Sequence, residues 1–76
     1  MNPIDLPACI NAKLERYFEQ LNGESANGVF KMVMQETESV TIKFVLDAVE
    51  QNQSEAARIL GMNRGTLKKK IELYKL

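Results

Sequence analysis

The sequence contains no histidine and no tryptophan, and Cys9 is its single cysteine. One thiol cannot form a disulfide within the chain, and without histidine it argues against the four-ligand set of a structural zinc. A chain of 76 residues buries only about 60% of the surface that its unfolded form exposes, so it needs a further source of stability. The source that remains is association with another copy, and we predict an obligate dimer.

The same scarcity argues against an enzyme. The chain lacks the histidine of a nucleophilic triad and has no glycine-rich phosphate loop. Its closely spaced carboxylates, Glu36 with Glu38 and Asp47 with Glu50, are typical of a solvated helix face. No apolar run reaches the ~20 residues of a transmembrane helix, and the N-terminus lacks the order of a signal peptide. An unpaired cysteine fits a reducing compartment, so we predict a cytoplasmic protein. From the missing residues above we also predict that it has no catalytic, metal or cofactor site.

The charge is unevenly divided along the chain, although the formal net charge is zero. Residues 1–50 carry four basic and eight acidic side chains, whereas residues 51–76 carry six basic and two acidic ones. Such asymmetry indicates a cationic end that binds a polyanion, attached to an acidic body. A nucleic acid is the polyanion that this arrangement favours.

Apolar side chains at helical spacing predict a first helix over about 7–21. Asp5 can cap its beginning, and Pro7 is tolerated in its first turn. Asn22-Gly23 supplies a left-handed end. The apolar stripe consists of Ile10, Leu14, Tyr17, Phe18 and Leu21.

A long helix is predicted over about 28–51, because residues 29–60 contain no glycine or proline. By propensity alone residues 39–45 would form a strand, but the chain offers no second strand to pair with it. The second half of the helix is apolar nearly all round and must be surrounded. A single 15-residue helix cannot do so, whereas a second copy of the chain can. We assign to the dimer core Phe30, Val33, Val40, Phe44, Val45 and Ala48.

The C-terminal residues predict two short helices around a tight turn, over 53–72. Ser54 is the expected cap of the first, which stops at Gly61, and Asn63 is the expected cap of the second. A helix-turn-helix needs a small residue where its helices touch, a glycine in the turn and apolar contacts beyond. Ala57, Gly61, Met62 and Leu67 stand in that order, although similar pairs also occur in helical hairpins.

The second short helix has one apolar and one polar side. Leu67, Ile71 and Tyr74 recur at helical spacing and form the expected buried seam. A buried seam on one side leaves the other side to solvent or to a ligand. The opposite arc carries Gly65, Lys68, Lys69 and Glu72.

The N-terminal end of this helix is the part that usually reaches base edges. Arg64 stands there, and arginine is the natural bidentate partner of guanine, as asparagine is of adenine. For Asn63 a helix cap without DNA contact is the stronger alternative. For Gly65 two readings remain open: an ordinary first-turn residue, or a close approach of the helix to DNA.

The run from Asn63 to Lys70, NRGTLKKK, resembles the recognition helix of the Fis family (factor for inversion stimulation), which comprises bacterial nucleoid-associated dimers. Similar matches occur at residues 17–23 and at 52–57. Enhancer-binding transcription activators carry a similar C-terminal domain on much larger chains. The match in the first helix and the start at Met1 favour a free-standing Fis protein.

The resemblance implies an all-α fold with four helices per chain, in which the first two form an intertwined homodimer. It implies a protein that binds loosely specific DNA sites and bends the DNA. Such a protein would act as a nucleoid-associated factor and transcriptional regulator. Arg64 and, less strongly, Asn63 would contact bases. Phosphate contacts would come from Asn52, Ser54, Thr66, Lys68, Lys69 and, towards flanking DNA, Lys70.

Two departures from the family pattern limit what carries over. Longer Fis proteins have an N-terminal β-hairpin arm that contacts DNA invertases, and the six residues before the first helix are too few to form it, so we expect no invertase contact. Longer relatives resemble one another in carrying Arg and Lys-Lys at the positions of Glu55 and Glu72-Leu73. Because acids near flanking phosphates weaken the wrapping of DNA, we expect a smaller DNA bend here. The alternative from another class is a dimeric helical adaptor whose basic end binds an acidic protein, and salt dependence discriminates the two.

Overall fold

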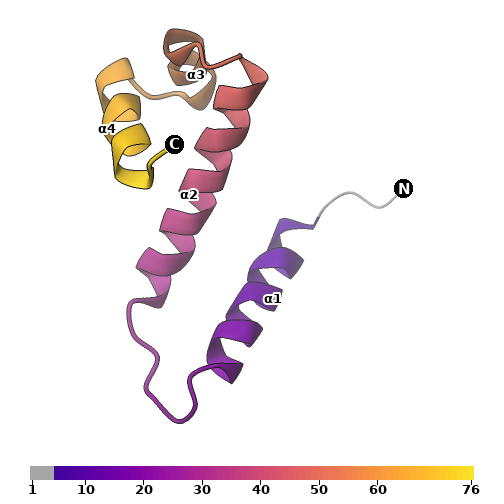
Figure 1. The fold of residues 1–76 in the computed structure, drawn as a ribbon. Helices are drawn as coiled ribbons and strands as arrows, with labels where there is room; N and C mark the ends of the chain where they lie inside the picture. Colours follow the sequence, from indigo (N-terminus) through magenta and orange to yellow (C-terminus); the bar gives the residue numbers. More distant parts are fainter. Residues whose placement is uncertain (1–4) are drawn as a thin grey trace. The chain divides into compact units, whose positions relative to one another are not determined.

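The computed structural model describes residues 5–76, which form four helices and, over that range, no strand (Figure 1). The all-α prediction is therefore confirmed. The chain divides into two compact parts, one ending at Val33 and the other comprising Met34–Leu76. Residues 1–4, on which the expectation about an N-terminal arm partly depends, lie outside the described range. The helices are α1 (Leu6–Glu19), α2 (Val29–Ala48), α3 (Gln53–Leu60) and α4 (Arg64–Tyr74).

Helix α1 begins where the sequence predicts. The Asp5 carboxylate accepts a hydrogen bond from the Ala8 amide at 3.4 Å, which satisfies one of the free N–H groups at the helix start. The helix ends at Glu19, two residues before the expected end. Asn22 (φ 51°) and Gly23 (φ 86°) then take the left-handed conformation that the Asn-Gly pair predicts.

The part of the chain around α1 leaves every residue of that helix at least partly exposed. The Tyr17 hydroxyl donates to the Asn27 carbonyl at 3.4 Å and accepts from the Asn27 amide at 3.5 Å. The Tyr17 and Phe18 rings pack edge to face with centroids 5.6 Å apart. No residue of α1 is buried, and Leu6 and Phe18 are 58% and 53% exposed. The apolar stripe of α1 is thus covered only in part: Phe18 is exposed, and the other four residues, Ile10, Leu14, Tyr17 and Leu21, are half-buried.

Helix α2 is the predicted long helix, and it includes the β-branched stretch 39–45 that by propensity alone would be a strand. It ends at Ala48, three residues before the predicted end. Glu50 and Gln51 have φ values of 53° and 67°, and the Gln51 amide closes the end by donating to the Leu46 carbonyl at 2.8 Å. Such left-handed ends usually carry glycine or asparagine. Since Glu50 and Gln51 are neither, the residue types do not indicate that the helix ends here.

The buried core lies entirely in residues 34–76 among the residues that the structure describes. It is formed where the C-terminal half of α2 meets α3 and α4. Burying a leucine or isoleucine side chain stabilises by about 1.5–3 kcal/mol, so α2 contributes strongly here. Partly buried Ile71 and Tyr74 join it, which confirms the predicted seam of α4. The core residues are Ile42, Leu46, Ala56, Ala57 and Leu67.

The opposite face of α2 is apolar and exposed. At about 100° per residue, Val40, Phe44 and Ala48 lie opposite Ile42 and Leu46. Val40 is 63% and Phe44 is 74% exposed, and Ala48 is exposed as well. We call Val40, Phe44 and Ala48 the outer face of α2.

The other residues predicted for a dimer core differ among themselves. Phe30 is 79% exposed and Val33 is half-buried. Val45, in contrast, packs against the core of its own chain. No helix within residues 5–76 is long and apolar enough to cross a membrane.

Candidate nucleic-acid interface

Helix α3 is capped by a residue that the sequence analysis did not choose. The Asn52 side-chain oxygen accepts a hydrogen bond from the Glu55 amide at 3.1 Å. The prediction that Ser54 is the cap is wrong, because Ser54 already lies in the first turn of α3, with its side chain exposed. A capping oxygen must precede its N–H partner by two or three residues, and Asn52 meets that spacing.

The turn between α3 and α4 has the predicted form. Gly61 has a φ of 75°, in the left-handed region where a side chain is strained. The Met62 amide donates to the Ala57 carbonyl at 3.1 Å and so closes the end of α3. Ala57 and Leu67 are buried where the two helices pack. The helix-turn-helix prediction is confirmed, with α4 running to Tyr74 rather than to residue 72.

Asn63 caps α4. Its side-chain oxygen accepts a hydrogen bond from the Thr66 amide at 2.8 Å. The prediction that Asn63 caps this helix is therefore confirmed. Asparagine has two amide donors in addition to that oxygen, so a base contact through the side-chain nitrogen remains a prediction.

The exposed side of α4 carries a cationic face, by which we mean Arg64, Lys68 and Lys69. All three side chains are exposed, and none has an ion-pair partner within residues 5–76. Arg64 is the first residue of the helix, and Lys68 follows about 6 Å further along the axis. The guanidinium thus stands at the N-terminal end of α4, with the two ammonium groups further along the helix. Thr66, another predicted phosphate contact, is half-buried.

Lys70 does not belong to this cationic face. Its ammonium group donates to the Glu38 carboxylate at 2.7 Å, and the Tyr74 hydroxyl donates to the same oxygen at 2.8 Å. Both hydrogen bonds lower the pKa of Glu38, and the one from Tyr74 to Glu38 raises the pKa of Tyr74. The predicted contact of Lys70 with flanking DNA would have to compete with Glu38.

Glu38 is the residue that sequence reasoning missed. Its spacing from Glu36 is typical of a solvated helix face, and its partners lie 32 and 36 residues further along the chain. A Lys and a Tyr one turn apart on a later helix offer no signal that points back to one acid. Only the packing of α4 on α2 identifies the partner.

Glu55 is also engaged. The Arg58 side chain donates from Nε to both Glu55 carboxylate oxygens at 3.1 Å. This hydrogen bonding lowers the pKa of Glu55, so the carboxylate stays ionised. Arg58 therefore balances the charge of Glu55 locally, and the smaller bend expected from Glu55 stays a prediction. Glu72 is exposed on α4.

Gly65 is not required by the fold. A Cβ atom added there would lie 3.6 Å from the Asn63 side-chain oxygen, an ordinary contact. A glycine in a helix costs roughly 1 kcal/mol relative to alanine. Packing within the chain therefore does not require a glycine here, and both readings of Gly65 stay predictions.

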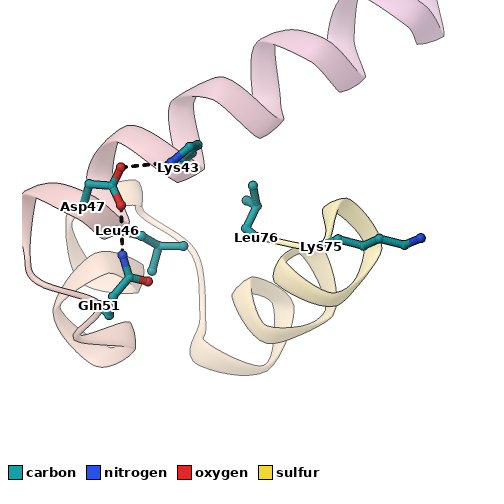
Figure 2. A pocket seen from close by; sticks show the side chains of 6 residues that line it. All are labelled: Lys43, Leu46, Asp47, Gln51, Lys75 and Leu76. Atoms are coloured by element: carbon teal, nitrogen blue, oxygen red, sulfur yellow. Dashed lines mark hydrogen bonds and ion pairs between the residues drawn. The ribbon is translucent and has the colours of Figure 1, made fainter.

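A hollow of about 250 Å³ lies between the end of α2 and the end of α4, with the buried Leu46 in its lining (Figure 2). Asp47 accepts hydrogen bonds from Lys43 at 3.2 Å and from Gln51 at 2.9 Å. The Lys75 ammonium extends away from the hollow. The polar side chains that line the hollow are thus bonded mainly to one another, and nothing in its lining argues for a bound ligand. Within residues 5–76, no group of three acidic or cysteine side chains is placed to hold a metal ion.

Comparisons with known proteins agree on one family. Residues 33–74 match the model of the bacterial regulatory proteins of the Fis family. The chain is 42% identical over 67 residues to a Fis-like DNA-binding protein of Neisseria meningitidis serogroup B, covering 88% of this chain and 85% of that one. It is 38% identical over 65 residues to the DNA-binding protein Fis of Proteus mirabilis, covering 86% of this chain. The chain spans 66% of the length of that relative.

Proposed function

The chain belongs to the Fis family of bacterial regulatory proteins, and from this premise we propose that it binds double-stranded DNA as a homodimer. Each protomer would place α4 in the major groove. The observation that carries the proposal is the cationic face, because three exposed cations without internal partners stand on the second helix of a helix-turn-helix. Arg64 would read a guanine edge, while Lys68 and Lys69 would neutralise phosphates.

The proposed dimer rests on the apolar surface that one chain leaves exposed. Phe44 on the outer face of α2, Phe18 in the stripe of α1 and Leu6 at the start of α1 are large apolar side chains that are more than half exposed. A second copy would bury them and supply the stability that a chain of this size lacks. Two protomers would also present two α4 helices to successive major grooves.

The proposed role is that of a nucleoid-associated factor and transcriptional regulator in the bacterial cytoplasm. One arginine per protomer gives loose base specificity, so the remaining preference would come from the deformability and minor-groove width of the DNA between the helices. In this role the protein bends DNA and needs no catalytic site.

A gel shift with duplexes of random and A/T-rich centres tests the proposal. Six phosphates neutralised per dimer would give a slope of log K against log salt of roughly −5. A triple variant in which Arg64, Lys68 and Lys69 become alanine should lose this binding. Lys43→Ala is the control, because Lys43 is a cation on α2 paired with Asp47. A parent protein that binds no duplex, but captures acidic polypeptides, would favour the adaptor instead.

A further inference from the structure

Helices α2 and α4 are joined by a polar contact as well as by apolar packing. We call Glu38, Lys70 and Tyr74 the clamp. One oxygen of Glu38 accepts from both the Lys70 ammonium, at 2.7 Å, and the Tyr74 hydroxyl, at 2.8 Å. The Lys70 distance is that of a strong hydrogen bond between charged groups, and the Tyr74 distance is the usual one for a hydroxyl donor. The Lys70 and Glu38 side chains are only 30% and 35% exposed.

Two other ion pairs in residues 34–76 lack this geometry. Lys43 pairs with Asp47 inside α2, and Arg58 pairs with Glu55 inside α3. All four of those side chains are more exposed than the clamp residues, and each pair spans one turn of a single helix. Such pairs support a helix locally but cannot fix one helix against another.

The clamp supplies directionality that the apolar core lacks. Burial of Ile42, Leu46 and Leu67 is favourable but non-directional, so it tolerates small rotations and tilts of α4. Hydrogen bonds weaken steeply away from their preferred angle. Two donors from successive turns of α4 on one oxygen of α2 therefore restrict both the rotation and the tilt of α4.

The position of Arg64 depends on that tilt. Arg64 lies six residues before Lys70, about 9 Å along the axis, so a tilt of about 10° at the clamp moves its Cα by roughly 1.6 Å. A binding group has to be held within about 0.5 Å of its productive position. A looser clamp would therefore spread the positions that Arg64 occupies.

We propose that Glu38 is a positioning residue: through the clamp it fixes the orientation of α4 on α2, and so the distance between the two Arg64 side chains that meet DNA. The inference rests on the proposed function, because it concerns how the dimer selects the spacing of two half-sites. Glu38 itself does not contact DNA in this proposal. It acts through Lys70 and Tyr74.

The test measures affinity by fluorescence anisotropy on duplexes whose two guanine half-sites are moved apart one base pair at a time. The parent should show a sharp optimum of spacing. Glu38→Ala should broaden that optimum and lower the affinity at its peak about five- to tenfold. This loss is part of what the bidentate contact of Arg64 with guanine contributes. Glu38→Gln retains an acceptor and should recover most of the profile. Asp47→Asn, which breaks a pair within α2, is the matched control and should leave the profile unchanged.

Tyr74→Phe removes one hydroxyl and gives a milder test should Glu38→Ala fail to fold, as judged by circular dichroism. Its profile should be broadened as well. An unchanged profile in a folded Glu38→Ala or Tyr74→Phe variant would overturn the positioning role, as would an equal loss at every spacing. Tighter binding at every spacing with a steeper salt slope would also overturn it, because Glu38 would then merely withhold Lys70 from phosphates. A parent that binds none of the duplexes refutes the proposed function itself, and the inference with it.

Discussion

Residues 34–76 and helix α1 differ in where their apolar side chains go. The first region buries five residues in a core of its own, made by α2, α3 and α4. Helix α1 buries none, and Leu6 and Phe18 stay more than half exposed. Helix α2 shows both behaviours, since Ile42 is 1% and Phe44 is 74% exposed. The C-terminal region thus closes within one chain, whereas α1 and the outer face of α2 leave exposed the apolar side chains that the proposed dimer would bury.

Truncating the outer face should have the largest effect on stability. Phe44→Ala should cost about 3–5 kcal/mol, the cost of a buried aromatic side chain, although Phe44 is 74% exposed in one chain. Denaturant unfolding at several protein concentrations measures this cost, and the midpoint of the parent should rise with concentration.

Leu73→Ala is the matched control for Phe44→Ala. Leu73 is 62% exposed on α4 and belongs to no surface that we assign to the dimer, so its loss should stay within about 0.5 kcal/mol. Midpoints that do not move over a hundredfold dilution would contradict the obligate dimer.

Substitutions in the cationic face should lower the affinity for DNA without lowering the stability of residues 34–76. Arg64→Ala should lose about 1–3 kcal/mol of binding per half-site and flatten discrimination between sites. Lys68→Ala should weaken all sequences alike and reduce the salt slope by about one per protomer. Neither variant should unfold, because both side chains are exposed and unpaired within residues 5–76. Guanine preference that survives in Arg64→Ala but not in Lys68→Ala would reverse the two roles.

Asn63 tests whether a cap also reads DNA. Asn63→Ala removes the hydrogen bond to the Thr66 amide and should lower stability by about 1 kcal/mol. Asn63→Ser keeps a capping oxygen and should restore that stability. A base contact predicts that adenine preference changes in both variants, whereas a pure cap predicts no change in either. Thermal unfolding and binding to variant duplexes measure the two effects separately.

The sequence predicted those parts of the fold that depend on local signals. The caps at Asp5 and Asn63, the left-handed turn at Gly61 and the seam of α4 were all readable from residue type and spacing. The end of α2 was not, because Glu50 and Gln51 adopt left-handed conformations without carrying the residues that usually mark them.

The candidate site shows the same division. Arg64, Lys68 and Lys69 could be identified from helical spacing, and the structure exposes all three. The pairing of Lys70 with Glu38 could not, since it depends on how α4 packs against α2 across 32 residues. Val45 was assigned to the dimer for a related reason: an all-round apolar helix does not reveal which side its own chain covers.

Gly65 should show opposite effects on the fold and on DNA binding. Since a Cβ atom fits there without a close contact, Gly65→Ala should stabilise the fold by about 0.5–1 kcal/mol. If α4 approaches DNA closely at this position, the same methyl group should weaken binding to every duplex. Gly61→Ala is the contrasting variant, because its φ of 75° makes any side chain destabilising. Unchanged affinity in Gly65→Ala would show that the glycine is an ordinary first-turn residue.

The clamp predicts the smallest effect, a dependence of stability on acid pH. Hydrogen bonds from Lys70 and Tyr74 lower the pKa of Glu38 in the folded protein below its ordinary value. A group with a lowered pKa stabilises above its unfolded pKa, and that stabilisation is lost as pH falls through the folded value. The parent should therefore exceed Glu38→Gln in stability at neutral pH, and the difference should shrink as the pH falls below about 4. Denaturant unfolding of both proteins across this range measures it. A difference that stays constant into strong acid would mean that Glu38 stabilises by its packing rather than by its charge.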